Sequence, residues 1–411
     1  MAVNYAKLFN LMDKRKIKVS DLEKCAGISS NIVARLKGNY YVSLKTIEKI
    51  CAALYCGVED LLSFDSVKTT AIDEKLSAHI QNRRYLGNKF KLLSFIKQVV
   101  TEHCTDVKIF ADIFAGTGAV ASAFTDKQLI VNDLLYCNHI CHLAWFGGER
   151  VRLGNLRGLI DEYNRIECTC KNYMVKNFAD TYFSQADCAK IGFVREDIEA
   201  KFKRGVINER ERAILIASLI YAMDKIANTC GHYDAYRHGA SFDRNLVIPM
   251  LDVPEKNNTA NQCFNEDANE LVKRVKANLV YLDPPYNSRQ YSDTYHLLEN
   301  VARWKKPPVF GVARKMDRSD LKSDYCTQKA AEVFKELIES IDARYILLSY
   351  NNMANNGDDR SNARISDECI FQTLKAKGRV KVFSKDYRAF SAGKSVRRDN
   401  AERLFLCEVS S

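Results

Sequence analysis

Proline is scarce in this sequence: the chain has only 6, and all of them lie at Pro249 or later. Long helices can therefore form before that point without a proline break. No apolar run approaches the roughly 20 residues that cross a bilayer, and residues 1–10 lack the basic-then-apolar layout of a secretion signal. These absences exclude a membrane-spanning helix and predict a cytoplasmic protein.

Acidic residues are the minority charge, with 51 Asp and Glu against 62 Lys and Arg and a net charge of +11. This surplus favours a polyanionic partner, and nucleic acid is the leading candidate. The 14 cysteines are scattered and no export signal accompanies them, so we expect free thiols rather than disulfides. A hydrophobic content of 46% over 411 residues can supply the cores of two or three domains.

Residues 1–65 have the pattern of a compact all-helical module. Glycine turns at Gly27 and Gly38 separate short amphipathic stretches, which predict helices over residues 5–16, 20–26, 29–37 and 44–55. Residues 66–82 are polar and show no strong apolar stripe. We therefore expect a linker or a surface helix there, before a second domain.

From Val107 onwards, strand and helix patterns alternate along the chain. Apolar runs predict strands at residues 107–114, 129–132, 279–282 and 345–349, with a hairpin-like tail at 380–383 and 404–408. This order favours a parallel, doubly wound α/β sheet within residues 83–411. Residues 150–250 are helical instead, and Asn208 with Glu211 has the spacing of a capping box. We expect a helical insertion in the sheet.

The most specific motif is Asp283-Pro284-Pro285-Tyr286, which directly follows the apolar strand at residues 278–282. A proline turn that merely closes a strand is one interpretation. The carboxylate, however, lies at the carboxyl end of a parallel strand, where ligands bind in open α/β sheets. Two prolines stiffen the backbone, and an aromatic ring follows at once. The pattern favours a clamp for the exocyclic amine of a flat base.

A second motif is Asp112-Ile-Phe114-Ala-Gly116-Thr-Gly118, placed between a strand and a helix. Glycines at this position let the backbone approach a nucleotide-like ligand, and Asp133 after the next strand can bind a ribose. The same spacing also fits a dinucleotide fingerprint, and an ordinary glycine turn is a third interpretation. The motif implies adenosine without specifying the rest of the cofactor.

A third motif, Arg84-Tyr85-Leu86-Gly87-Asn88-Lys89, lies just upstream of the glycine loop. On composition alone it is an ordinary basic surface segment. Its position favours a role beside the loop, where Tyr85 could stack on a cofactor and Lys89 could neutralise a carboxylate.

Together these motifs resemble the N6-adenine DNA methyltransferases, over about residues 82–409, and the run Asn287-Ser-Arg-Gln-Tyr-Ser-Asp-Thr-Tyr-His296 resembles type IIS modification methylases. The resemblance implies a Rossmann-like α/β methyltransferase sheet. It also implies that Asp133 holds the ribose of S-adenosylmethionine and that Asp267 faces its adenine. Further cofactor contacts would come from Tyr85, Lys89, Asp112, Phe114, Gly116 and Gly118.

The resemblance also implies the chemistry of the motif Asp283 to Tyr286. The sulfonium methyl of the cofactor is already activated, so neither a metal nor a covalent intermediate is needed. Asp283 and the carbonyl of Pro284 would accept the two amine hydrogens of an adenine extruded from the duplex. Tyr286 would stack on that base, a contact worth roughly 1–3 kcal/mol.

The amino-terminal module has a resemblance of its own. Ser20 to Ser29, followed by Ser30-Asn31-Ile-Val-Ala-Arg35-Leu-Lys-Gly, is similar to the Cro/repressor-type helix-turn-helix. In that fold the second helix enters the major groove, so Ser30, Asn31 and Arg35 would read base edges. A helical packing module that binds no DNA is the alternative.

Two further stretches have ordinary interpretations. Cys137-x-His139-x-Cys141-His142 and Cys168-x-Cys170 contain metal-ligand residue types, but their spacing matches no common zinc module, so thiols on helices are favoured and no metal is expected. A basic stretch between Arg303 and Arg318 can follow phosphates, although such runs are often only solvated.

The sequence therefore predicts a helix-turn-helix domain followed by an adenine-N6 methyltransferase that acts on double-stranded DNA, as the protective half of a restriction–modification system with a cognate endonuclease. The helical insertion would read the target sequence. Competing interpretations are an N4-cytosine or RNA adenine methylase, a transcription regulator with a non-catalytic ligand domain, and a nicotinamide oxidoreductase. The last leaves Asp283 to Tyr286 without a role.

Overall fold

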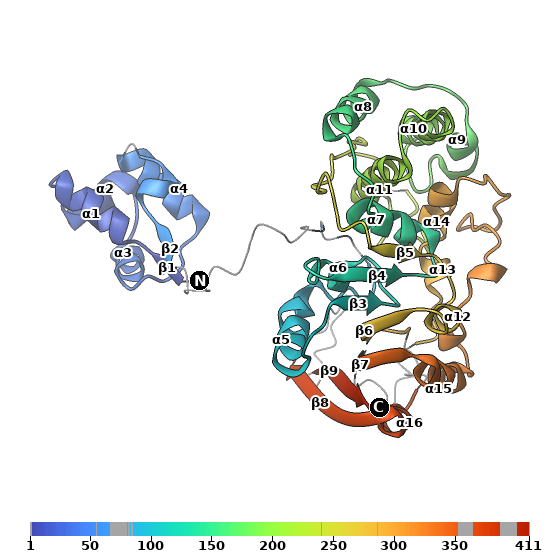
Figure 1. The fold of residues 1–411 in the computed structure, drawn as a ribbon. Coiled ribbons are helices and arrows are strands. Elements are labelled where there is room, and N and C mark those ends of the chain that lie inside the picture. Colours follow the sequence, from blue (N-terminus) through green and yellow to red (C-terminus); the bar gives the residue numbers. More distant parts are fainter. Residues whose placement is uncertain are drawn as a thin grey trace. The chain divides into compact units, whose positions relative to one another are not determined.

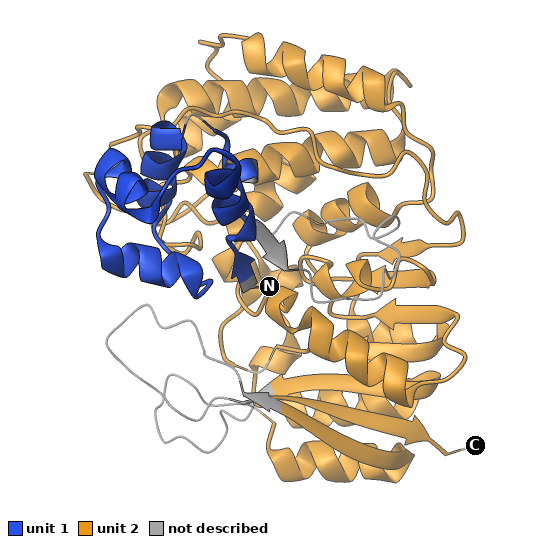
Figure 2. Cartoon of the chain, turned by 90° about the vertical axis from the view of Figure 1, so that its left-hand side faces the viewer, with its two compact units in different colours: residues 1–75 blue, residues 76–411 orange. Residues whose placement is uncertain are grey.

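The computed structural model describes residues 2–54, 56–65, 80, 83, 85–239, 241–285, 287–351, 365–386 and 401–410. The chain divides into two compact units, residues 1–75 and 76–411 (Figure 2). Nearly all of the predicted linker at residues 66–82 lies outside the described residues, as does Tyr286. Among the described residues, no helix is long and apolar enough to cross a membrane.

Over residues 2–54 and 56–65, the amino-terminal unit contains four α-helices, one 3-10 turn and two short strands: β1 (Ala2–Asn4), α1 (Ala6–Lys14), α2 (Val19–Ala26), α3 (Ser30–Lys37), α4 (Leu44–Leu54), η1 (Val58–Asp60) and β2 (Ser63–Asp65). The expectation of an all-helical module was wrong, because β1 pairs antiparallel with β2. Strands of three residues are too short for a period-2 pattern to show. The predicted turn at Gly27 is confirmed, with φ of +58° at the end of α2.

A separate apolar core holds this unit together. Leu22 of α2, Val33 and Leu36 of α3, and Ile50 of α4 are all at most 3% exposed. On α3 the buried positions are three apart, which leaves the opposite side of the helix in solvent. Helix α3 therefore packs against the core of this unit through one side only.

The second unit is built on a seven-stranded sheet in the order β5-β4-β3-β6-β7-β9-β8. The first five strands in this order are parallel, and β9 runs antiparallel to both of its neighbours. The predicted α/β class, the predicted strands and the hairpin tail are confirmed. The strands are β3 (Ile109–Asp112), β4 (Gln128–Asn132), β5 (Gln262–Phe264), β6 (Lys276–Leu282), β7 (Asp342–Asn351), β8 (Gly378–Asp386) and β9 (Ala401–Val409).

Both faces of this sheet are buried. Along β6, Leu279 and Tyr281 join one core with helices that include α5 (Leu93–His103), α7 (Tyr136–Phe146) and α11 (Glu209–Ile226). Val280 and Leu282 join a second core with α12 (Ala268–Val272), α15 (Ala330–Ser340) and α16 (Asp367–Lys377). This alternation follows from the period of two along a strand. A continuous apolar run such as β6 is what a parallel strand covered on both sides requires.

The helices of this unit are α5 (Leu93–His103), α6 (Ala119–Ser122), α7 (Tyr136–Phe146), α8 (Leu153–Arg165), α9 (Tyr173–Phe178), α10 (Gln185–Lys203), α11 (Glu209–Ile226), α12 (Ala268–Val272), α13 (Tyr291–Thr294), α14 (His296–Arg303), α15 (Ala330–Ser340) and α16 (Asp367–Lys377), with 3-10 turns η2 (Phe90–Leu92), η3 (Ser319–Leu321) and η4 (Asp324–Cys326).

Helices α8 to α11 lie between β4 and β5 in the chain, where the sequence predicts a helical stretch. Figure 1 shows them stacked beyond the β5 edge of the sheet. The capping box of α11 is confirmed: Asn208 Oδ1 accepts from the Glu211 N–H at 2.8 Å, and Glu211 Oε2 accepts from the Asn208 N–H at 3.0 Å. Helices α12 to α15 gather along one side of the sheet, which is the side of the candidate site.

Candidate active site

The glycine loop lies at the carboxyl end of β3, between that strand and α6. Gly116 and Gly118 have φ values of +53° and +81°, in the left-handed region that L side chains rarely adopt. A Cβ on Gly116 would lie 3.2 Å from the ring of Tyr85, and one on Gly118 would lie 3.0 Å from Phe146. The loop therefore needs glycine both for its backbone shape and for its close packing.

Asp133 follows β4 and holds this loop in place. Its Oδ2 accepts from the Gly116 N–H at 2.9 Å, while Oδ1 accepts from the Leu135 N–H at 2.9 Å and from the Asn138 side-chain amide at 3.1 Å. Burial raises the pKa of Asp133 to about 6, although these hydrogen bonds act in the opposite direction. The carboxylate predicted to bind a ribose thus also orders the glycine loop.

A histidine that the sequence reasoning left without a role supports the same loop. His142 of α7 is fully buried, and its Nε2 lies 2.9 Å from the carbonyl oxygen of Gly116. Burial lowers the pKa of His142 to about 3, so the neutral ring donates Nε2–H to that carbonyl. In the part of the chain that the structure describes, no three Cys, His, Asp or Glu side chains gather as metal ligands.

Tyr85 connects the upstream motif to the segment after Pro285. Its ring stacks on Tyr295 at a centroid distance of 4.5 Å and on Tyr291 at 5.5 Å. Its hydroxyl oxygen accepts from the Asn138 side-chain amide at 2.9 Å. The backbone N–H of Leu86 donates to the Tyr295 hydroxyl at 2.8 Å. The two motifs, about 200 residues apart in the chain, therefore form one wall of stacked rings.

Lys89 contacts the motif carboxylate directly. Its Nζ lies 3.0 Å from Asp283 Oδ2 and 3.4 Å from Glu402 Oε1, and the Lys89 side chain is only 7% exposed. Glu402 also accepts from the Ser349 hydroxyl at 2.8 Å. The predicted contact of Lys89 with a cofactor carboxylate stays a prediction. The sequence did not predict its ion pairs with Asp283 and Glu402.

The surroundings set the charge of Asp283. Burial raises the pKa of Asp283 to about 6, and the Lys89 ammonium opposes this effect while Glu402 adds to it. Asp283 is therefore mostly ionised at neutral pH and can accept hydrogen bonds through both oxygens.

Asp112 lies at the end of β3 and is only 1% exposed. No side chain among the described residues hydrogen-bonds to its carboxyl group. Burial, followed by the nearby charge of Asp283, raises the pKa of Asp112 well above its ordinary value. Asp112 is thus a buried acid at the cavity wall, and no described Lys, Arg or His forms an ion pair with it.

Most of the predicted site residues line one cavity. Its volume is about 940 Å³, including the part that is open to solvent. Its wall includes Tyr85, Lys89, Asp112, Phe114, Gly116, Asp133, Asp267, Asp283 and Pro285. Gly118 and Pro284 are not part of the wall, and Tyr286 lies outside the described residues. Lining residues that the sequence reasoning missed are Gln290, Tyr291, Ser323 and Tyr325.

Asp267 has a structural task in addition to its place at the cavity. It is the N-cap of α12, and its Oδ1 accepts from the N–H groups of Asn269 at 2.9 Å and Glu270 at 3.3 Å. Its residue surface is exposed. One carboxylate oxygen is left for a ligand, and the predicted contact with the cofactor adenine stays a prediction.

The predicted DNA-reading residues lie on α3 of the amino-terminal unit. Ser30, Asn31 and Arg35 are all exposed, and Asn31 and Arg35 lie on the side of the helix opposite Val33 and Leu36. The Arg35 guanidinium donates to the carbonyl of Tyr41 at 2.8 Å. Ser30 and Asn31 are thus presented to solvent at the first turn of α3, while Arg35 is held against the segment after the helix.

The sheet, the glycine loop and the carboxylate at the end of β6 define an α/β fold of the nucleotide-binding type, with a buried carboxylate at the wall of its cavity. The D12 class N6 adenine-specific DNA methyltransferase model matches residues 85–356, and a Cro/C1-type HTH DNA-binding domain model matches residues 7–66. The chain belongs to the D12 class family. Both resemblances predicted from the sequence are confirmed.

Its relatives are modification methylases. It is 35% identical over 286 residues to modification methylase StsI of Streptococcus sanguinis, covering 66% of this chain and 44% of the relative. It is 32% identical over 346 residues to M.FokI of Planomicrobium okeanokoites, covering 78% and 51%. M.NlaIII of Neisseria lactamica is 30% identical over 331 residues, covering 77% and 95%. The chain thus spans about half the length of StsI and M.FokI.

Proposed function

We propose that the chain transfers a methyl group from S-adenosylmethionine to N6 of an adenine in duplex DNA. The observation that supports this most is the position of Asp283. Its carboxylate and the glycine loop of Gly116 belong to the same cavity wall, so an amine acceptor and a nucleotide-binding loop share one space. Membership of the adenine-specific family supports adenine as the base.

The residues present fit S-adenosylmethionine. Asp112 is a buried acid with no side-chain hydrogen-bond partner among the described residues, which suits the cofactor ammonium, and Asp133 is fixed beside the loop for a ribose. Side chains on Gly116 and Gly118 would crowd Tyr85 and Phe146 and distort this cradle. When bound, the cofactor would supply a methyl group that is already activated on a sulfonium.

For this reaction the chain would have to position the amine of the base, and it would not have to remove a proton before methyl transfer. The Asp283 carboxylate and the Pro284 carbonyl would each accept one N–H of the base, which directs the nitrogen lone pair toward the methyl donor. The two prolines hold both acceptors on a stiff backbone. Lys89 would keep Asp283 ionised, and Glu402 with Ser349 would hold Lys89 in place.

The test is transfer of radiolabel from S-adenosylmethionine to duplex DNA, followed by nucleoside analysis. We expect label in N6-methyldeoxyadenosine alone, no transfer by Asp283→Ala, and partial transfer by Asp283→Asn, whose amide oxygen still accepts a hydrogen bond. Label in N4-methylcytosine, or only in RNA, would replace this function by one of its competitors. Absence of transfer to any nucleic acid would refute it.

We also infer that the amino-terminal unit binds DNA through α3, and that the chain protects host DNA beside a cognate endonuclease. The exposed Ser30 and Asn31 support the first inference, and the modification methylases among its relatives support the second. In the full chain, Asn31→Ala should weaken binding to the DNA site selected by the wild type, whereas Asn4→Ala should not. Equal binding by both variants would exclude α3 as the reading element.

A further inference from the structure

The connection that follows α14 exposes large apolar side chains. Phe310 is 65% exposed and Val312 is 72% exposed, and Pro308 is exposed as well. Val309, which lies between Pro308 and Phe310, is half-buried against the main core of the unit. Exposed apolar residues that stand together in this way mark an interaction site more often than scattered ones do.

This apolar tip is held in a defined shape. Phe310 and Lys315 exchange two backbone hydrogen bonds, at 2.8 and 2.9 Å, which close a small loop. Gly311 and Arg314 turn the chain with φ values of +68° and +51°. The Tyr182 hydroxyl donates to the Ala313 carbonyl at 3.0 Å. The side chains at the tip are therefore presented by an ordered turn.

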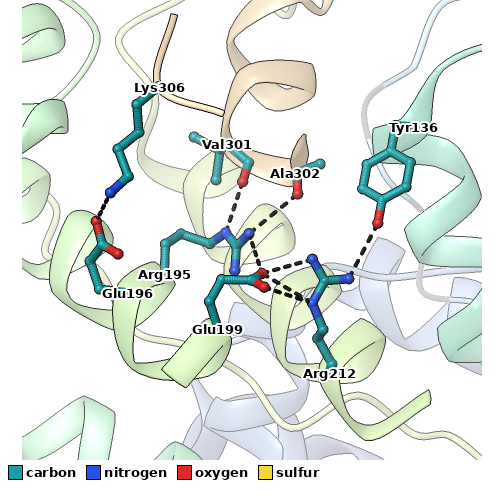
Figure 3. Close-up of polar contacts among 8 residues, drawn as sticks. All are labelled: Tyr136, Arg195, Glu196, Glu199, Arg212, Val301, Ala302 and Lys306. Carbon is teal, nitrogen blue, oxygen red and sulfur yellow. Dashed lines mark hydrogen bonds and ion pairs between the residues drawn. The ribbon is translucent and has the colours of Figure 1, made fainter. Parts of the chain in front are cut away.

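The base of the connection is equally well anchored. Trp304 is 8% exposed, and the Arg195 guanidinium lies 5.3 Å from its ring centroid. Arg195 also donates to the carbonyls of Val301 at 2.8 Å and Ala302 at 3.3 Å, at the end of α14 (Figure 3). Lys306 forms an ion pair with Glu196 of α10. The loop thus takes its position from α10 and α14.

The charge around the tip fits a polyanion. Residues 303–318 contain six Lys or Arg and one Asp. Of the basic side chains, Lys305 and Arg314 are exposed, and within the described ranges neither forms an ion pair. Apolar tips flanked by cations are typical of elements that enter a nucleic acid between phosphates.

The loop is also connected to the candidate active site. Arg318 donates to Asp293 of α13 at 2.6 Å, and Tyr291 of the same helix lines the cavity. Leu321, three residues beyond Arg318, lines the cavity too. Figure 1 shows the orange segment after α14 on the same side of the sheet as α12, α13 and α15. A duplex whose adenine enters the cavity would pass beside this loop.

We propose that the loop Phe310–Arg314 is a wedge that inserts Phe310 and Val312 into duplex DNA beside the extruded adenine. This inference rests on the proposed function. Extrusion breaks the stacking of a base, and apolar side chains placed in the gap replace part of that stacking. Lys305 and Arg314 would bind the phosphates on either side of the gap.

The test compares two duplexes that carry the methylation site identified by sequencing of modified bases. In one the target adenine pairs with thymine, and in the other it faces an abasic position, so extrusion costs little. The variants are Phe310→Ala/Val312→Ala in the full chain and, as a control, Val382→Ala, an exposed valine on β8. Single-turnover methylation rates are measured at saturating cofactor.

We expect the double variant to lose about tenfold or more in rate on the paired duplex and to stay within about threefold of wild type on the abasic duplex, because only extrusion needs the wedge. The control should match wild type on both. Equal loss on both duplexes, or no loss, overturns the wedge and leaves the methyltransferase proposal standing. No transfer by the wild type to either duplex overturns both proposals.

Discussion

Asp283 lies among groups of both charges. Lys89 contacts it at 3.0 Å, Glu402 lies 3.4 Å from the same ammonium, and burial together with the charge of Asp283 raises the pKa of Asp112. A carboxylate that must accept hydrogen bonds from an amine has to stay ionised in spite of its burial. The lysine provides this, since a cation within hydrogen-bond distance favours the ionised form.

The pH dependence of methylation should report this arrangement. Burial raises the pKa of Asp283 to about 6, so the ionised form, which is the stronger acceptor, is lost as the pH falls through that value. At saturating cofactor, which offsets the similar titration of Asp133, kcat/KM for DNA should fall about tenfold per pH unit below the midpoint. Lys89→Met removes the cation that lowers the pKa of Asp283, and should move the midpoint up by about one unit.

Lys91→Met, a change to an exposed lysine two residues away, is the matched control and should leave the midpoint in place. A pH profile that Lys89→Met does not shift would show that the ion pair has no part in ionising Asp283.

The sequence predicts some of these residues and misses others for a definite reason. Asp283, Lys89 and Asp133 stand in motifs whose local order of strand, turn and helix indicates a site. Glu402 and Ser349 lie inside strands β9 and β7, where nothing in the neighbouring residues distinguishes a buried polar side chain in the Lys89 network from one in solvent. Their role follows from strand pairing across the sheet, since Ser349 lies opposite Leu404, two residues from Glu402.

At the level of elements, a buried ion network joins the helical insertion to the helix that follows the motif. Arg195 of α10 has no exposed side-chain surface, and it contacts Glu199 at 2.8 Å as well as the last carbonyls of α14. Glu199 also accepts from Arg212 of α11 at 2.7 Å, and Arg212 donates to the Tyr136 hydroxyl at 3.2 Å (Figure 3). The network around Glu199 therefore connects four helices, α7, α10, α11 and α14.

Glu199→Gln should lower the free energy of unfolding of the second unit by about 3 kcal/mol, because it leaves a buried guanidinium without its countercharge. Glu196→Gln on the same helix is the control. Its partner Lys306 is 40% exposed, so the loss should stay below about 1 kcal/mol. Urea unfolding of the full chain measures both. Equal losses would show that the network does not hold the insertion in place.

The sequence predicts helices and strands best where their characteristic residue pattern extends over many residues. The strands β6 and β7 and the capping box of α11 were all visible in the sequence. The strands β1, β2 and β5 were missed, because each has three residues and no period can be recognised over so short a run. β5 matters for the site all the same, since it leads into Asp267 at the cavity wall.

On the scale of the whole molecule, one chain of net charge +11 contains a unit of the Cro/C1-type HTH family and a unit of the D12 class methyltransferase family. Each unit has its own core. The charge surplus predicts that DNA affinity falls steeply with salt for both units, while sequence selection comes from specific side chains. We propose that the chain modifies adenine at one DNA sequence and that it needs Asp283 to do so.

Sequencing the genomic DNA of a host that expresses the protein, with detection of modified bases, tests that claim most directly. We expect N6-methyladenine at a single recognition sequence with the wild type and none at that sequence with Asp283→Ala. An unmodified genome with the well-folded wild type, or equal modification with both proteins, would contradict it.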